Sequence, residues 1–140
     1  MAPLSVFWER IKKDFSHKDI IYTGKVTDQE LVSLYKNAQV YVCPSLEEGF
    51  GIPLLEAMAC GCPVVSSNRA SLPEIGGHEA LYFDPFNQDD MVSKISQVLN
   101  SPSLRRQMIE NGFKKSKWFN WEKLAKQTLE VYYESCSRTR

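Results

Sequence analysis

Residues 43–66, CPSLEEGFGIPLLEAMACGCPVVS, carry the strongest structural signal in this chain. A short apolar run ends at Cys43 and predicts a buried strand that leads into a loop. Pro53 then falls in the first turn of a predicted helix, and Gly61 lies just past the helix end. A second buried strand is predicted to start at 63–65. This order of strand, glycine loop, helix and strand predicts a βαβ unit that binds a ligand at the carboxyl end of its first strand.

Two carboxylates in this segment carry the chemical argument. Glu48 lies in the loop just before the glycines, and Glu56 lies in the second turn of the helix. The helix is apolar on nearly every side, so we expect it to be buried and Glu56 to need donors within reach. Carboxylate oxygens suit neighbouring sugar hydroxyls, glycines allow close approach of backbone N–H groups, and a helix N-terminus attracts phosphate. The pattern therefore predicts a nucleotide-sugar site.

Strands alternate with helices along the rest of the chain, which indicates an α/β fold with a mostly parallel sheet. We expect short strands at 20–22 and 81–83 and a helical turn at 73–75. Apolar periodicity predicts helices at 4–15, 28–37, 88–99, 103–115 and 121–133.

The composition predicts one globular domain, because 140 residues leave room for a single core. The 17 basic and 17 acidic side chains balance, so the basic face that nucleic acid requires is not expected. No run of apolar residues is long enough to predict a membrane span, and no secretory signal is visible. Cys43, Cys60 and Cys62 lie among apolar residues, and we interpret them as small buried hydrophobes in a reducing compartment.

The run P-S-x-x-E-G-F-G-x-P-x-x-E-A-M-A-C-G-x-P-V-V resembles the motif of the retaining glycosyltransferases of family four. Those enzymes have the GT-B architecture, in which two Rossmann-like domains face each other across a cleft. Flanking motifs extend the resemblance: T-G-K-V at 23–26, S-L-P-E at 71–74 and L-Y-F-D-P at 81–85. The resemblance implies a Rossmann-like parallel sheet flanked by helices, as a partial C-terminal, donor-binding domain of the GT-B fold.

The resemblance also implies roles for individual residues. Glu56 would accept hydrogen bonds from the ribose hydroxyls, and Lys25 and Val26 would line the nucleobase. The residues that it implies around the donor sugar and diphosphate are Glu48, Gly49, Phe50, Gly51 and Ile52. No residue is assigned as catalytic, and no metal or other cofactor is expected beside the UDP- or GDP-sugar donor.

The chain departs from the family pattern at its amino end. The donor domain of that family should open with two further strand–helix units, yet residues 1–19 predict only a helix. The resemblance therefore implies that 1–140 form a single partial domain, without the acceptor-binding amino-terminal domain and inactive alone. We expect the strand at 20–22 either to pair directly with the strand at 40–43 or to leave a sheet edge exposed.

The leading hypothesis is a glycosyltransferase that moves a hexose, with mannose favoured by the S-L-P-E motif, to a glycan or lipid acceptor with retention. The full enzyme is expected in the cytoplasm, with peripheral association at the inner face of the membrane. One alternative is a non-catalytic nucleotide-binding or partner-binding module. A less favoured one is a glycoside hydrolase that uses Glu48 and Glu56 as its carboxylate pair, which would need carboxyl groups about 5–9.5 Å apart.

Overall fold

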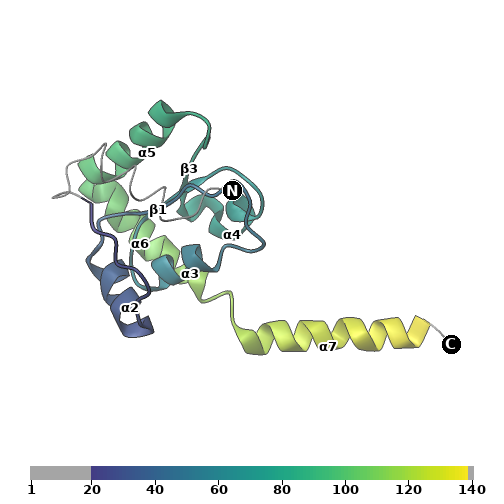
Figure 1. The fold of residues 1–140 in the computed structure, drawn as a ribbon. Helices are drawn as coiled ribbons and strands as arrows, with labels where there is room; N and C mark the ends of the chain where they lie inside the picture. The colour runs from purple at the N-terminus through teal and green to yellow at the C-terminus, as the bar shows by residue number, and fades with distance from the viewer. Residues whose placement is uncertain (1–19, 139–140) are drawn as a thin grey trace.

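The structure is a computed structural model that describes residues 20–138. The chain folds into a body of helices around a short sheet, from which one last helix extends (Figure 1). The helix expected at 4–15 lies outside the described residues.

The sheet contains three parallel strands in the order β1-β2-β3. These are β1 (Tyr41–Cys43), β2 (Val64–Ser67) and β3 (Leu81–Phe83). The central strand β2 is buried along its whole length, as expected for a parallel strand with both faces covered. The predicted α/β class, with a Rossmann-like parallel sheet flanked by helices, is confirmed.

Helices connect the strands and cover both faces of the sheet (Figure 1). Some begin at side-chain caps such as Thr27, which forms a reciprocal capping box with Glu30 ahead of the first of them. The helical elements, with their bounds, are α2 (Asp28–Asn37), α3 (Ile52–Ala59), α4 (Leu72–Gly76), the 3₁₀ turn η1 (Gly77–Glu79), α5 (Gln88–Asn100), α6 (Pro102–Ser116) and α7 (Trp121–Arg138). The helices predicted from apolar periodicity between 28 and 133 are confirmed, with ends that differ by a few residues.

The core lies on both sides of β2, because successive side chains of a strand point to opposite faces. Val64 belongs to the cluster formed with α2, α3 and α4, whereas Val65 packs with residues of β3, α5 and α6. The core is therefore thin, with one helix layer on each face of a narrow sheet.

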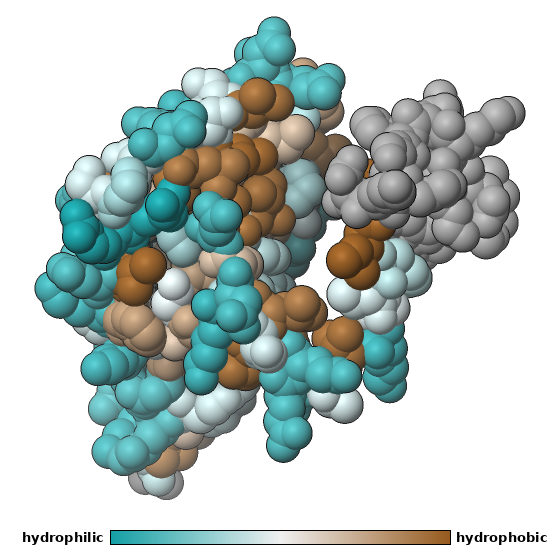
Figure 2. All heavy atoms as spheres, turned by 90° about the vertical axis from the view of Figure 1, so that its left-hand side faces the viewer, coloured by the Kyte–Doolittle hydropathy of each residue, from teal (hydrophilic) through white to brown (hydrophobic). Residues whose placement is uncertain are grey.

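On the outer surface, hydrophilic side chains cover much of the face drawn in Figure 2, and apolar ones gather in separate patches.

The predicted strand at 20–22 is wrong. These residues form no strand, and Ile21 is 85% exposed. Three apolar residues favour extended backbone, but a strand requires a hydrogen-bonding neighbour, and none of the described strands pairs with this segment. Among residues 20–138, β1 pairs only with β2, so the direct pairing expected between 20–22 and 40–43 is wrong, and the other edge of β1 has no strand partner within that range.

The last helix, α7, extends away from the body (Figure 1). Every side chain described on it is exposed, including that of Trp121. Within the described part of the chain, no helix has the length and apolar character needed to cross a membrane.

Candidate functional site

The carboxyl ends of the three strands meet at one edge of the sheet, because all three are parallel. Three connecting segments begin there: residues 44–51 after β1, residues 68–71 after β2, and residues 84–87 after β3. Ligands of open parallel α/β sheets bind at this edge. The structure therefore places the predicted glycine loop where the fold favours a binding site.

Gly51 connects this loop to α3. It is the N-cap of α3 and has a φ of 96°, in the left-handed region that other residues rarely adopt. A Cβ at this position would lie 3.0 Å from Leu72 Cδ2, so both the backbone conformation and the close contact favour glycine. No side chain caps the N-terminus of α3, and its positive end faces the loop that carries Glu48.

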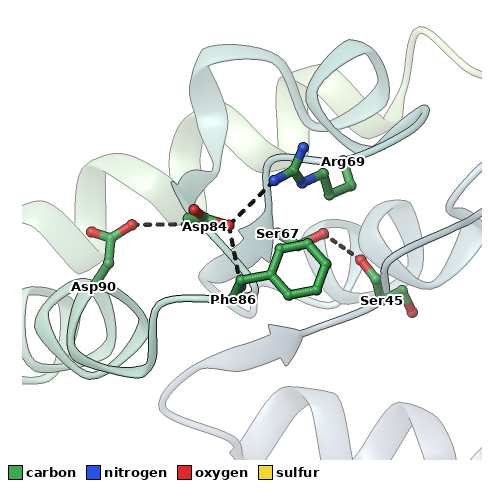
Figure 3. Close-up of polar contacts among 6 residues, drawn as sticks. All are labelled: Ser45, Ser67, Arg69, Asp84, Phe86 and Asp90. Carbon is green, nitrogen blue, oxygen red and sulfur yellow. Dashed lines mark hydrogen bonds and ion pairs between the residues drawn. The ribbon is translucent and has the colours of Figure 1, made fainter.

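Glu48 is half-buried and held by serines. The hydroxyl of Ser45 donates a hydrogen bond to Glu48 Oε1 at 2.9 Å. The hydroxyl of Ser71 contacts the backbone oxygens of Glu48 and Phe50, at 3.0 and 2.9 Å. The backbone oxygen of Ser45 in turn accepts a hydrogen bond from the hydroxyl of Ser67 on β2 (Figure 3). The loop is thus fixed to the ends of β2 and α4.

Glu56 is exposed, so the prediction that it is a buried carboxylate is wrong. Ile52 and Ala59 lie on the same side of α3 and are exposed as well. The helix is apolar all round, but the described elements cover only its other sides, where Leu54 and Met58 are buried. Apolar composition indicates that a face favours contact; it does not say whether a contact is made within the same chain.

The expected donor to Glu56 is present. The hydroxyl of Tyr35, on α2, lies 3.5 Å from Glu56 Oε2. Burial and, next, the charge of Glu56 raise the pKa of Tyr35 to about 12, so its hydroxyl stays protonated at neutral pH. Tyr35 was not among the site residues predicted from sequence, because it is separated from Glu56 by 21 positions and sits in the apolar stripe of its own helix.

The exposed side of α3 lines a groove of 740 Å³. Its opposite wall is formed by the junction between α6 and α7, where Trp118, Phe119 and Trp121 are found. The ring of Phe50 meets that of Phe119 edge to face, with 5.9 Å between centroids. The groove therefore joins the glycine loop, Glu56 and an aromatic junction, and its lining is mostly apolar.

Lys25 and Val26 precede α2. Lys25 is exposed, and within residues 20–138 no hydrogen bond or ion pair joins it to the glycine loop. Their assignment to the nucleobase stays a prediction.

Arg69 lies at the same edge of the sheet. Its guanidinium pairs with Asp84 at 3.4 Å and lies 5.4 Å from the ring centroid of Phe86 (Figure 3). The backbone N–H of Phe86 donates to the same carboxylate, at 3.1 Å. Both charged side chains are 45% exposed, so this contact contributes little to stability and mainly connects the segments after β2 and β3.

Metal-ligating residues do not gather in the described part of the chain: residues 20–138 contain no cluster of three or more His, Cys, Asp or Glu side chains suited to an ion. The cysteines are free, with Cys43 and Cys62 buried, Cys60 partly buried and Cys136 exposed.

A family model described as "Glycosyl transferases group 1" matches residues 7–115. The chain belongs to this family. Over 127 residues it is 41% identical to O-antigen chain mannosyltransferase B of Escherichia coli, a match that covers 91% of this chain and 33% of that protein. It is also 34% identical over 135 residues to the MMP alpha-(1->4)-mannosyltransferase of Mycolicibacterium hassiacum, covering 93% of this chain and 33% of that protein.

The group 1 glycosyltransferase fold is also found in solved structures. Sucrose-phosphate synthase from Thermosynechococcus elongatus superposes with a TM-score of 0.83 at 26% identity, covering 96% of this chain and 34% of the other. The sheet and its helices are therefore those of a GT-B glycosyltransferase. The chain spans about a third of the length of each of these proteins.

Proposed function

We propose that this chain binds a nucleoside diphosphate sugar and is the donor-binding part of a hexosyltransferase that retains the anomeric configuration. The observation that carries the proposal is the position of the two glutamates on either side of the N-terminus of α3. Glu48 lies in the loop before it, and Glu56 lies one turn further along the helix on its exposed side. Membership of the group 1 glycosyltransferases supports this reading of the pair.

Each contact is assigned by its chemistry. Glu56 Oε1 and Oε2 accept hydrogen bonds from the ribose hydroxyls, and Glu48 accepts from a hydroxyl of the donor sugar. Backbone N–H groups of Gly49, Phe50, Gly51 and Ile52 face the diphosphate, whose charge is favoured by the end of α3. Lys25 and Val26 border the base.

The donor we propose is GDP-mannose. Two similar proteins are named mannosyltransferases, which supports mannose over other hexoses. The acceptor, a glycan or lipid, binds a second domain outside this chain. Peripheral membrane association and a cytoplasmic location, where nucleotide sugars are found, stay predictions.

The chemistry we propose depends on positioning. The glutamates bind and orient the donor and neither forms a covalent intermediate. The rate gain comes from alignment of the donor with the acceptor and from stabilisation of the leaving diphosphate by backbone N–H groups in a cleft that excludes water. We propose no metal for this step.

Calorimetric titration of this chain with GDP, UDP, GDP-mannose and UDP-glucose tests the proposal. We expect one nucleotide to bind and Glu56→Ala to abolish its binding. Glu110→Ala is the matched control, since Glu110 is an exposed glutamate on α6 that does not line the groove. Absence of binding to all four compounds, or binding that Glu56→Ala leaves intact, would overturn the proposal. Nucleotide binding without transfer by the protein joined to its acceptor domain would instead favour the non-catalytic module.

A further inference from the structure

Glu48 is connected to the sheet through a chain of serine hydroxyls. Ser67, fully buried on β2, donates to the backbone oxygen of Ser45, and the Ser45 hydroxyl donates to Glu48 Oε1 at 2.9 Å (Figure 3 shows the first contact). A glutamate in a loop ordinarily samples several rotamers. Here Glu48 Oε1 accepts a hydrogen bond from Ser45, whose backbone oxygen accepts one from Ser67 on the central strand.

The backbone of the loop is held by Ser71. Its hydroxyl lies 3.0 Å from the backbone oxygen of Glu48 and 2.9 Å from that of Phe50, so its single proton is shared between two acceptors. Ser71 is also the N-cap of α4, where a serine usually accepts a hydrogen bond from its own helix. It makes no such bond, so its hydroxyl serves the glycine loop and not the helix.

The second carboxylate oxygen of Glu48 is available to accept a hydrogen bond from a ligand. Among residues 20–138, no group donates a hydrogen bond to Oε2. Glu48 is half-buried, in a loop at the carboxyl edge of the sheet. A carboxylate with one oxygen anchored and the other open loses less freedom when it binds a hydroxyl than a mobile one would.

We propose that Ser45 and Ser71 are positioning residues that orient Glu48, and that this orientation sets the affinity for the sugar half of the donor. The inference rests on the proposed function, because it takes the sugar as the partner of Glu48. The proposal assigns different residues to the two halves of the ligand. Ser45 and Ser71 affect binding of the sugar through Glu48, whereas Glu56 binds the ribose of the nucleotide.

The test compares GDP-mannose with GDP by calorimetry, using this chain and its variants. We expect Ser45→Ala and Ser71→Ala each to weaken GDP-mannose binding about threefold to tenfold, the range of one ordinary hydrogen bond, and to leave GDP binding unchanged. Ser45→Thr and Ser71→Thr keep the hydroxyl and should keep the affinity. Ser93→Ala, on the exposed side of α5, is the matched control and should change neither value.

Glu48→Gln distinguishes failure of the positioning role from failure of the proposed function. If it weakens GDP-mannose binding while both alanine variants bind like the wild type, the positioning role is overturned and the proposed function stands. If Glu48→Gln has no effect, or neither compound binds, the proposed function fails. Amide hydrogen exchange without ligand gives an independent readout: residues 46–51 should exchange faster in Ser71→Ala than in Ser93→Ala, and equal rates would overturn the role of Ser71.

Discussion

The hydroxyl of Tyr35 on α2 donates a hydrogen bond to Glu56 on α3, over 3.5 Å, and this contact orients the one carboxylate on the exposed side of α3. Tyr35 is 8% exposed, and its ring packs edge to face against that of Tyr41, with 5.5 Å between centroids. The contact thus connects a rigid core residue to a glutamate that lines the groove.

Tyr35→Phe should lower nucleotide affinity more than stability. The ring stays packed, so we expect the free energy of unfolding to fall by about 1 kcal/mol or less, the net value of one hydrogen bond. Binding of GDP should weaken severalfold, because Glu56 loses its orienting donor, whereas binding of 2′,3′-dideoxy-GDP, which lacks the ribose diol, should not change. Calorimetry with both nucleotides measures this, with the exposed Tyr132→Phe as control. Equal losses for both nucleotides would contradict the role assigned to Tyr35.

Stability should decrease at high pH in part through two tyrosines, the buried Tyr35 and the partly buried Tyr82. Burial, followed by the charge of Glu56 for Tyr35 and of Glu79 for Tyr82, raises the pKa of each hydroxyl to about 12. In the unfolded chain a tyrosine has a pKa of about 10. The raised pKa therefore adds stability that is complete below about pH 10 and is lost as the pH rises through about 12.

Urea unfolding followed by circular dichroism between about pH 9 and pH 12 checks this slope. The double variant Tyr35→Phe, Tyr82→Phe should give a flatter dependence of the free energy of unfolding on pH. Tyr132→Phe, on exposed α7, should leave the slope as it is. Burial also raises the pKa values of Tyr41 and Cys62, so part of the slope should remain in the double variant. A double variant as steep as the wild type would refute the contribution of Tyr35 and Tyr82.

Ala70→Gly should stabilise the chain. Ala70 has a φ of 51°, the only positive φ of a non-glycine residue among those described. This conformation costs alanine about 1–2 kcal/mol, and part of the gain is cancelled because glycine has more freedom in the unfolded chain. We expect a net increase of about 0.5–1 kcal/mol in urea unfolding, whereas Ala70→Val should destabilise. An unchanged or lower midpoint for Ala70→Gly would contradict this account.

Gly51→Ala should destabilise the chain, and Gly49→Ala should not. Gly51 has a φ of 96°, and an added Cβ would lie 3.0 Å from Leu72 Cδ2, so we expect a loss of about 1–3 kcal/mol. Gly49 lies two positions earlier in the same loop, but a Cβ added there would meet no described atom within 4 Å, and its φ is not in the left-handed region. Thermal unfolding of the two variants measures the difference; similar midpoints would show that the loop adapts.

Sequence signals that act over a few residues predicted the helix and strands on either side of the site. Pro53 and Gly61 delimit α3 in the sequence as they do in the structure, and the apolar runs at 64–65 and 81–83 form strands. These signals act within a few residues of one another, so they are readable along the chain.

Contacts between distant segments were not readable in the same way. Ser71 and Glu48 are separated by 23 positions, and nothing in the local sequence of either indicates that one holds the other. The burial of Glu56 was predicted wrongly for a related reason: apolar neighbours in a helix do not say which side another element will cover. The strand expected at 20–22 failed because pairing depends on a neighbouring strand and not on the segment itself.

The extended course of α7 determines what the tryptophans report. Trp118 and Trp121 are 68% and 81% exposed, at the point where the chain leaves the body, and Trp8 lies outside the described residues. The emission of these two indoles therefore monitors the junction and the adjoining groove, and is insensitive to melting of the apolar interior around β2. Quenching or a spectral shift of the Trp118 and Trp121 emission would signal a molecule entering the groove while the domain remains folded.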